Sequence, residues 1–234
     1  MGSDSMNIAI ILAGGTGTRL GANRPKQYLE INNRPIIAYS MQAINICKKI
    51  DAIWIVADEM WRDYIREHVC MEKVKGFSQP GINRQLSIWN ALFDMRGEAE
   101  PDAKVFIHDA ARPVLSEDMV VRYLEAAEGY DGVLPVLPMK DTVYLSKDGK
   151  TITSLLDRTE VVAGQAPEVF VYEKYYQANK ALLPDKILQI NGSTEPAILA
   201  GMNVATVPGE ERNFKITTQA DLERFRRICE SKNL

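Results

Sequence analysis

Asn7-Ile8-Ala9-Ile10-Ile11-Leu12 is a short, continuous apolar run that leads directly into a glycine-rich segment. Such a run, closed by glycines, is typical of a strand that is buried on both faces of a parallel sheet. Runs of the same character recur at residues 50–57, 104–108 and 132–138, and the stretches between them have helical spacing. This alternation predicts an α/β fold with one doubly wound, mostly parallel sheet.

Three sites carry signals for the start of a helix. Pro35 is predicted to occupy the first helical position of a helix that continues through Met41. Ser116, followed by two acidic residues, is a favourable N-cap. Thr218, with Asp221 three residues later, predicts a capping box for the last helix.

One segment, residues 141–158, departs from the alternating pattern. Two β-prone runs flank Lys147-Asp148-Gly149-Lys150, which is a strong hairpin-turn signal. We therefore expect a two-stranded arm at about residues 140–160 that projects from the domain.

The bulk composition indicates one domain. With 234 residues, 46% of them hydrophobic, the chain is long enough for a single large core. Residues 1–5 precede a second methionine, Met6, and are expected to be left over from cloning, so the domain is predicted to span residues 6–234. No apolar run approaches the roughly 20 residues of a membrane span, and nothing has the layout of a secretion signal, so we expect a cytoplasmic protein without a membrane partner.

Charge and cysteine content exclude several other classes. The three cysteines have no paired spacing, which argues against a disulfide framework and against a zinc site. A formal net charge of -3 provides no broad footprint for nucleic acid.

The segment after the first strand is expected to bind phosphate. It reads A-G-G-T-G-T-R-L-G over residues 13–21, and glycines allow backbone N–H groups to face an anion. The motif is neither a P-loop nor a dinucleotide-binding fingerprint, and taken alone it could be a simple turn. Lys26, in Pro25-Lys26-Gln27-Tyr28, adds a second cation seven positions after Arg19, although most lysines are merely solvated.

A-G-G-x-G-x-R-x-G followed by P-K-Q-Y resembles the opening of the nucleotidyltransferases, which have a Rossmann-like fold. The whole chain resembles the 2-C-methyl-D-erythritol 4-phosphate cytidylyltransferases and the closely similar ribitol-5-phosphate cytidylyltransferases. Five blocks follow the order of that family, at residues 13–27, 81–87, 108–113, 157–170 and 213–218.

The resemblance implies an enzyme that transfers CMP from CTP to a small polyol phosphate and releases pyrophosphate, with Mg²⁺ as cofactor. It implies catalytic roles for three cations that neutralise phosphate charge: Arg19, Lys26 and Lys215. The implied nucleotide-binding residues are Ala13, Gly14, Gly15, Gly17, Gly81 and Ser87. The implied substrate-binding residues are Asp109, Arg112, Thr142, Arg158 and Thr194. Asp109 follows a strand directly and is also the candidate metal ligand, whereas His108 is expected to be structural.

The family pattern further implies a homodimer in which Thr142 and Arg158 of the arm reach the partner's site. The chain departs from the pattern at Glu168, where the family usually has the second glutamine of Q-T-P-Q, and at Glu195, where it has aspartate. H-D-A-A-R-P is typical of the methylerythritol enzymes, whereas the glycine loop and the arm favour the ribitol enzymes, so both alcohols remain open. Two other functions also remain open: a sugar-1-phosphate nucleotidyltransferase that uses another nucleotide, and a nucleotide-binding regulatory homologue.

Overall fold

A central sheet organises the chain, for which a computed structural model describes residues 5–17 and 24–231. Within these residues the sheet has eight strands in the order β10-β7-β11-β6-β1-β4-β5, and β12 also pairs with β7. The strands are β1 (Asn7–Leu12), β4 (Ala52–Val56), β5 (Val74–Ser78), β6 (Lys104–Asp109), β7 (Gly132–Pro138), β10 (Val162–Gly164), β11 (Glu168–Val171) and β12 (Val204–Pro208). Among the described strands of this sheet, only β10 and β11 pair antiparallel with their neighbours, which confirms a mostly parallel sheet.

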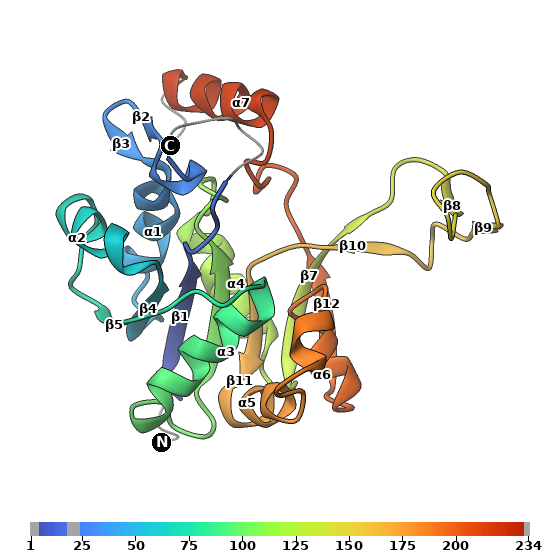
Figure 1. Cartoon of the computed structure of the whole chain (residues 1–234), viewed down its shortest axis with the longest axis horizontal. Helices are drawn as coiled ribbons and strands as arrows, with labels where there is room; N and C mark the ends of the chain where they lie inside the picture. Colours follow the sequence, from blue (N-terminus) through green and yellow to red (C-terminus); the bar gives the residue numbers. More distant parts are fainter. Residues whose placement is uncertain (1–4, 18–23, 232–234) are drawn as a thin grey trace.

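Helices cover both faces of this sheet (Figure 1). On one face lie α1 (Ile36–Ile46), α2 (Glu59–His68) and α4 (Glu117–Ala126); on the other lie α3 (Arg84–Asp94), α5 (Tyr172–Lys180) and α6 (Glu195–Leu199). Strand β1 shows that both faces of the sheet are buried. Ala9 and Ile11 pack into one core, whereas Ile8 and Ile10 pack into the other. The predicted doubly wound fold is therefore confirmed.

The C-terminal helix α7 (Gln219–Glu230) packs in a smaller core beside a short hairpin. That hairpin consists of β2 (Glu30–Ile31) and β3 (Arg34–Pro35). The described residues also include three 3-10 turns: η2 (Lys26–Tyr28), η3 (Met95–Gly97) and η4 (Lys186–Gln189). None of the helices within residues 5–17 and 24–231 is long and apolar enough to cross a bilayer.

Two of the three predicted helix starts are confirmed. Ser116 accepts a hydrogen bond from the Met119 amide at 3.3 Å, and Thr218 and Asp221 form the reciprocal capping box. The prediction for Pro35 is wrong by one residue. Pro35 is the extended N-cap of α1, with ψ at 148°, because its backbone still belongs to strand β3.

The predicted arm is present. It contains β8 (Val143–Leu145) and β9 (Ser154–Leu156), paired antiparallel with Tyr144 opposite Leu155. Gly149 adopts a φ of +68° in the connection, and a carboxylate oxygen of Asp148 accepts hydrogen bonds from the Lys150 and Thr151 amides. The arm extends far from the sheet and its helices (Figure 1).

The order of strands places two predicted motifs side by side. Strands β1 and β6 are parallel neighbours, and their registers pair Leu12 with Asp109 at the carboxyl ends. The glycine-rich segment therefore leaves the sheet directly beside Asp109. Ligands bind at this edge in open α/β sheets.

Candidate active site

A cavity of about 390 Å³ opens at this edge of the sheet. Five segments form it: the glycine-rich loop, the start of η2, the turn that leads into α3, the end of β6 and the segment before α7. Its wall includes eight residues that the sequence predicted for the site: Gly14, Gly15, Gly17, Lys26, Gly81, Ser87, Asp109 and Lys215. Segments separated by up to about 200 positions thus meet around one space.

The Pro25-Lys26-Gln27-Tyr28 segment braces the glycine-rich loop. The buried amide of Gln27 donates to the carbonyl oxygens of Ala13 at 2.6 Å and of Gly15 at 2.8 Å. The Tyr28 hydroxyl donates to the same Ala13 carbonyl at 2.9 Å. Ala13 itself is buried and does not line the cavity, and its carbonyl oxygen anchors the loop to Gln27 and Tyr28.

Gly17 is required by the conformation of this loop. Its φ is +68°, and a Cβ atom there would lie 2.8 Å from the backbone nitrogen of Lys26. A side chain would therefore be strained and would also push Lys26 away. Glycine at this position lets the loop pass close to the residue that is predicted to bind phosphate.

Ser87 organises the turn before α3. Its hydroxyl accepts a hydrogen bond from the Gly81 amide at 3.0 Å and donates one to the Asn83 carbonyl at 2.9 Å. Asn83 caps the helix by accepting from the Leu86 amide at 2.8 Å. Ser87 faces the cavity rather than solvent, which supports its predicted place in the nucleotide site.

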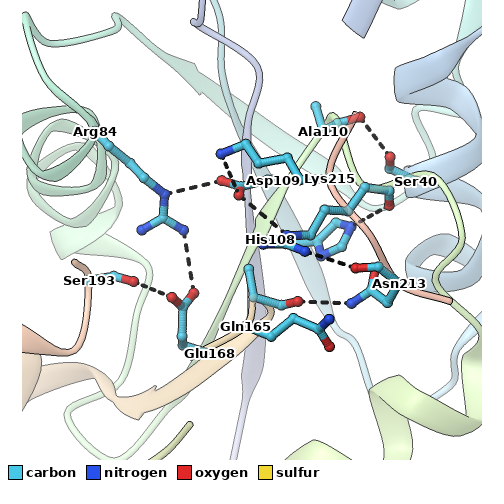
Figure 2. Close-up of polar contacts among 12 residues, drawn as sticks. Ser40, Arg84, His108, Asp109, Ala110, Gln165, Glu168, Ser193, Asn213 and Lys215 are labelled. Atoms are coloured by element: carbon cyan, nitrogen blue, oxygen red, sulfur yellow. Dashed lines mark hydrogen bonds and ion pairs between the residues drawn. The ribbon is translucent and has the colours of Figure 1, made fainter. Parts of the chain in front are cut away.

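Asp109 is the electrostatic centre of the cavity (Figure 2). Its Oδ1 is 3.1 Å from Arg84 Nε, and its Oδ2 is 2.9 Å from Lys215 Nζ and 3.6 Å from Arg112 Nε. Burial alone would raise the pKa of Asp109, but the positive charges of Arg84, Lys215 and Arg112 hold it well below the ordinary range of a carboxyl. Asp109 is therefore ionised at neutral pH and cannot act as a general acid.

His108, one residue earlier, has a structural environment. The ring is fully buried, and its Nε2 lies 3.0 Å from the Arg112 carbonyl oxygen, to which a protonated Nε2 donates. Burial lowers the pKa of His108 to about 4, so the ring is neutral at physiological pH. It does not line the cavity, in agreement with the expected structural role.

Arg112 joins three of the five sequence blocks instead of facing the cavity. Its Nη1 donates to the Asn213 carbonyl at 2.8 Å, and the Asn213 side chain donates to the Ala166 carbonyl at 2.9 Å. The Ile216 amide donates to the Ala111 carbonyl at 2.9 Å. These bonds fix the segment that carries Lys215 beside Asp109.

The other predicted site residues lie elsewhere. Thr142 and Arg158 belong to the arm, where Arg158 Nη1 donates to the Lys140 carbonyl at 2.9 Å, and neither lines the cavity. Thr194 is the N-cap residue of α6 and is also outside the cavity wall. Arg19 lies outside the described residues.

Asp109 does not fit the predicted role of magnesium ligand in this arrangement. Both of its oxygens already face cationic side chains, and a divalent cation placed there would be repelled by Lys215 and Arg84. Across residues 5–17 and 24–231, His, Cys, Asp and Glu side chains do not gather in groups of three that could hold a metal ion.

Sequence reasoning missed Arg84 and Ser193. Arg84 lines the cavity and joins Asp109 to Glu168, and Ser193 donates its hydroxyl hydrogen to Glu168 (Figure 2). The signal that could have found them was the departure at Glu168, because a carboxylate in a buried strand requires a cationic or hydrogen-bonding partner.

A glycine-rich loop at the carboxyl edge of a parallel sheet, with lysines and an arginine around one cavity, defines a nucleotidyltransferase-like enzyme of the α/β class. The model of the family IspD, 2-C-methyl-D-erythritol 4-phosphate cytidylyltransferase, matches residues 7–231, and the chain belongs to this family. It is a CTP-dependent nucleotidyltransferase by family.

Curated relatives agree with this assignment, and a solved structure agrees with the fold. The chain is 30% identical to a ribitol-5-phosphate cytidylyltransferase of Vibrio parahaemolyticus, over 97% of each chain. It is 33% identical to a 2-C-methyl-D-erythritol 4-phosphate cytidylyltransferase of Rubrobacter xylanophilus, over 92% of this chain and 91% of the relative. The fold matches the crystal structure of 4-diphosphocytidyl-2C-methyl-D-erythritol synthase from Anaerococcus prevotii with a TM-score of 0.81 and 24% identity, over 97% of each chain.

Proposed function

We propose that the chain transfers CMP from CTP to a small polyol phosphate, either 2-C-methyl-D-erythritol 4-phosphate or ribitol 5-phosphate. The products are a CDP-alcohol and pyrophosphate. One observation carries the proposal: Lys26 and Lys215 converge with the glycine-rich loop on one cavity, as a site for a triphosphate requires, and Arg84 lines the same cavity.

The chemistry needs no nucleophilic side chain. A phosphate oxygen of the polyol phosphate attacks the α-phosphorus of CTP, and the bond from that phosphorus to the bridging oxygen breaks as pyrophosphate leaves with the electron pair. Lys26 and Lys215 offset the negative charge that develops on the α-phosphoryl oxygens, and Arg19 is proposed to hold the outer phosphates. Asp109 fixes Lys215 through their 2.9 Å ion pair, so the ammonium group is in place before substrate arrives.

Mg²⁺ remains the cofactor in this proposal. Because Asp109 is surrounded by cations, the phosphate oxygens of CTP are better ligands for the ion than that carboxylate. The metal would supply further neutralisation of phosphate charge.

Measurement of pyrophosphate release tests the proposed function. Each of CTP, ATP, GTP and UTP is combined with each of the two polyol phosphates and with a sugar 1-phosphate. Release with CTP and one polyol phosphate is expected. Release with another nucleotide and the sugar phosphate would establish the rival transferase, and nucleotide binding without release in any combination would establish a regulatory protein.

We further propose a homodimer formed through the arm. Ile152 is 65% exposed and Leu155 is 64% exposed in the single chain, and Tyr144 and Leu145 are also exposed. A two-stranded hairpin with such side chains is marginal in water unless another surface covers it. The arm extends away from its own domain, which leaves a second copy as the covering surface (Figure 1).

In that dimer, Thr142 and Arg158 of one subunit are proposed to contact the alcohol phosphate in the other subunit's cavity. Subunits inactivated at Lys26 are mixed with subunits inactivated at Arg158, and part of the activity is expected to return because one hybrid cavity regains both cations. A monomer in sedimentation, or no recovery after proven subunit exchange, would contradict the shared site.

A further inference from the structure

Glu168 is a buried carboxylate next to the cavity and not part of its wall. It is the first residue of β11, and only 7% of its surface is exposed. Its Oε1 accepts the hydroxyl hydrogen of Ser193, and its Oε2 lies 3.4 Å from Arg84 Nη2 (Figure 2). Each carboxylate oxygen thus serves a different segment of the chain.

Arg84 connects Glu168 to the cavity. The planar guanidinium uses Nη2 for Glu168 and Nε for Asp109 Oδ1, which is 3.1 Å away. Two carboxylates on one rigid fork fix both its place and its plane. Since Arg84 lines the cavity and Glu168 does not, the side-chain contact between Glu168 and the cavity runs through Arg84.

Ser193 connects Glu168 to a second segment, the turn that leads into α6. It is 2% exposed, and its carbonyl oxygen accepts a hydrogen bond from the buried Tyr175 hydroxyl at 2.7 Å. The next residue, Thr194, is the N-cap of α6 and was predicted to contact the alcohol substrate. In the same turn, Glu195 accepts from the Asn191 amide at 2.9 Å, so its longer side chain closes the loop on itself.

Charge distinguishes Glu168 from the glutamine that is usual in the family. Asp109 and Glu168 contribute two negative charges, and Arg84, Arg112 and Lys215 contribute three positive charges, so this cluster carries a net charge of +1. A glutamine could still accept from Ser193, but it would leave the cluster at +2 and would release one side of the Arg84 fork.

We propose that Glu168 is a positioning residue that sets specificity for the alcohol substrate, by holding Arg84 against Asp109 and the Ser193–Thr194 turn against the sheet. This inference rests on the proposed function and on the polyol-binding roles that the family resemblance implies for Asp109 and Thr194. According to the proposal, glutamate at position 168, where glutamine is usual in the family, affects the binding of the alcohol rather than the binding of CTP.

Steady-state kinetics of Glu168→Gln test the proposal. The KM for the polyol phosphate is expected to rise about tenfold, because an ionic hydrogen bond that orients the site is lost. The KM for CTP and kcat are expected to stay within about twofold, since the loop that binds phosphate is untouched. Glu210→Gln is the control, because Glu210 also pairs with an arginine, Arg122 at 2.7 Å, and does so away from the cavity.

A double-mutant cycle with Arg84→Lys identifies the route. If Glu168 acts through Arg84, the loss of kcat/KM in Glu168→Gln and in Arg84→Lys will not add in the double variant. An unchanged KM for the alcohol in Glu168→Gln, an equal rise for CTP, or full additivity would overturn the proposal.

Crystal structures of the wild type and of Glu168→Gln provide a readout that does not depend on the reaction. The guanidinium of Arg84 is expected to leave residue 168 and to turn toward Asp109 and the cavity, and an unmoved guanidinium would refute the positioning role. If the wild type uses another substrate pair, the proposed function is wrong, and the same kinetic comparison on that pair then decides the role of Glu168.

Discussion

Acid sensitivity of the fold is expected to depend on His108. The ring is completely buried and neutral, because burial lowers its pKa from 6.5 to about 4. In the unfolded chain the same ring regains an ordinary pKa and binds a proton below about pH 6.5. The unfolded state therefore binds more protons than the folded state between about pH 6.5 and 4, and stability falls as the pH is lowered through that window.

The size of the effect follows from the two pKa values. The free energy of unfolding is expected to be about 2 kcal/mol lower at pH 5 than at pH 8, and about 3 kcal/mol lower near pH 4. Replacement of His108 by Gln removes the titration while a side-chain amide can still donate to the Arg112 carbonyl, which the ring nitrogen meets at 3.0 Å. The variant is expected to be less stable than the wild type at pH 8 and to lose less stability on acidification.

Urea unfolding at several pH values between 8 and 5 measures this difference. His68→Gln is the matched control, because His68 is exposed on α2 and is the other histidine of the chain. The wild type and His68→Gln are expected to lose stability in parallel, and His108→Gln is expected to lose about 2 kcal/mol less by pH 5. Parallel loss in all three proteins would refute the assignment.

Three other substitutions test the cavity and the arm. Lys26→Ala is expected to lower kcat by about 10²-fold or more and to weaken the fold far less, as steady-state kinetics and thermal melting will show. Gly17→Ala is expected to destabilise the protein by about 1 kcal/mol in urea unfolding and to raise the KM for CTP, since the residue sits at a φ of +68° against Lys26; wild-type values for both would contradict that. Leu155→Glu is expected to convert the proposed dimer to monomer in sedimentation, and an unchanged dimer would show that the arm is not the interface.

The sequence predicted the sheet because its strands are buried on both faces. A continuous apolar run such as Asn7–Leu12 indicates a strand that is buried on both faces. The glycines after that run indicated the edge of the sheet at which ligands bind. Local capping signals also succeeded, because Ser116 and Thr218 satisfy their helices with neighbouring atoms. The prediction for Pro35 was wrong by one residue, because the backbone of Pro35 pairs with Glu30 and belongs to strand β3.

The interior of the cavity was less accessible to sequence reasoning. Lys26, Lys215 and Asp109 were predicted through family motifs, and the structure brings them to one wall. The ion pairs that join Asp109 to Arg84 and Arg84 to Glu168 were not predicted. Arg84 opens an ordinary amphipathic helix, and its partner Glu168 is 84 positions later.

The departures from the family pattern take on a physical meaning only in three dimensions. Glu168 would be a costly buried charge in isolation, but Arg84 lies against it and also contacts Asp109, so a carboxylate is held on each side of the same guanidinium. Removal of either carboxylate therefore changes the orientation that the other imposes. Because Arg84 lines the cavity, a substitution made in a strand behind the wall has its consequence at the surface that substrate meets. This is why the change at position 168 belongs to substrate selection rather than to the packing of β11.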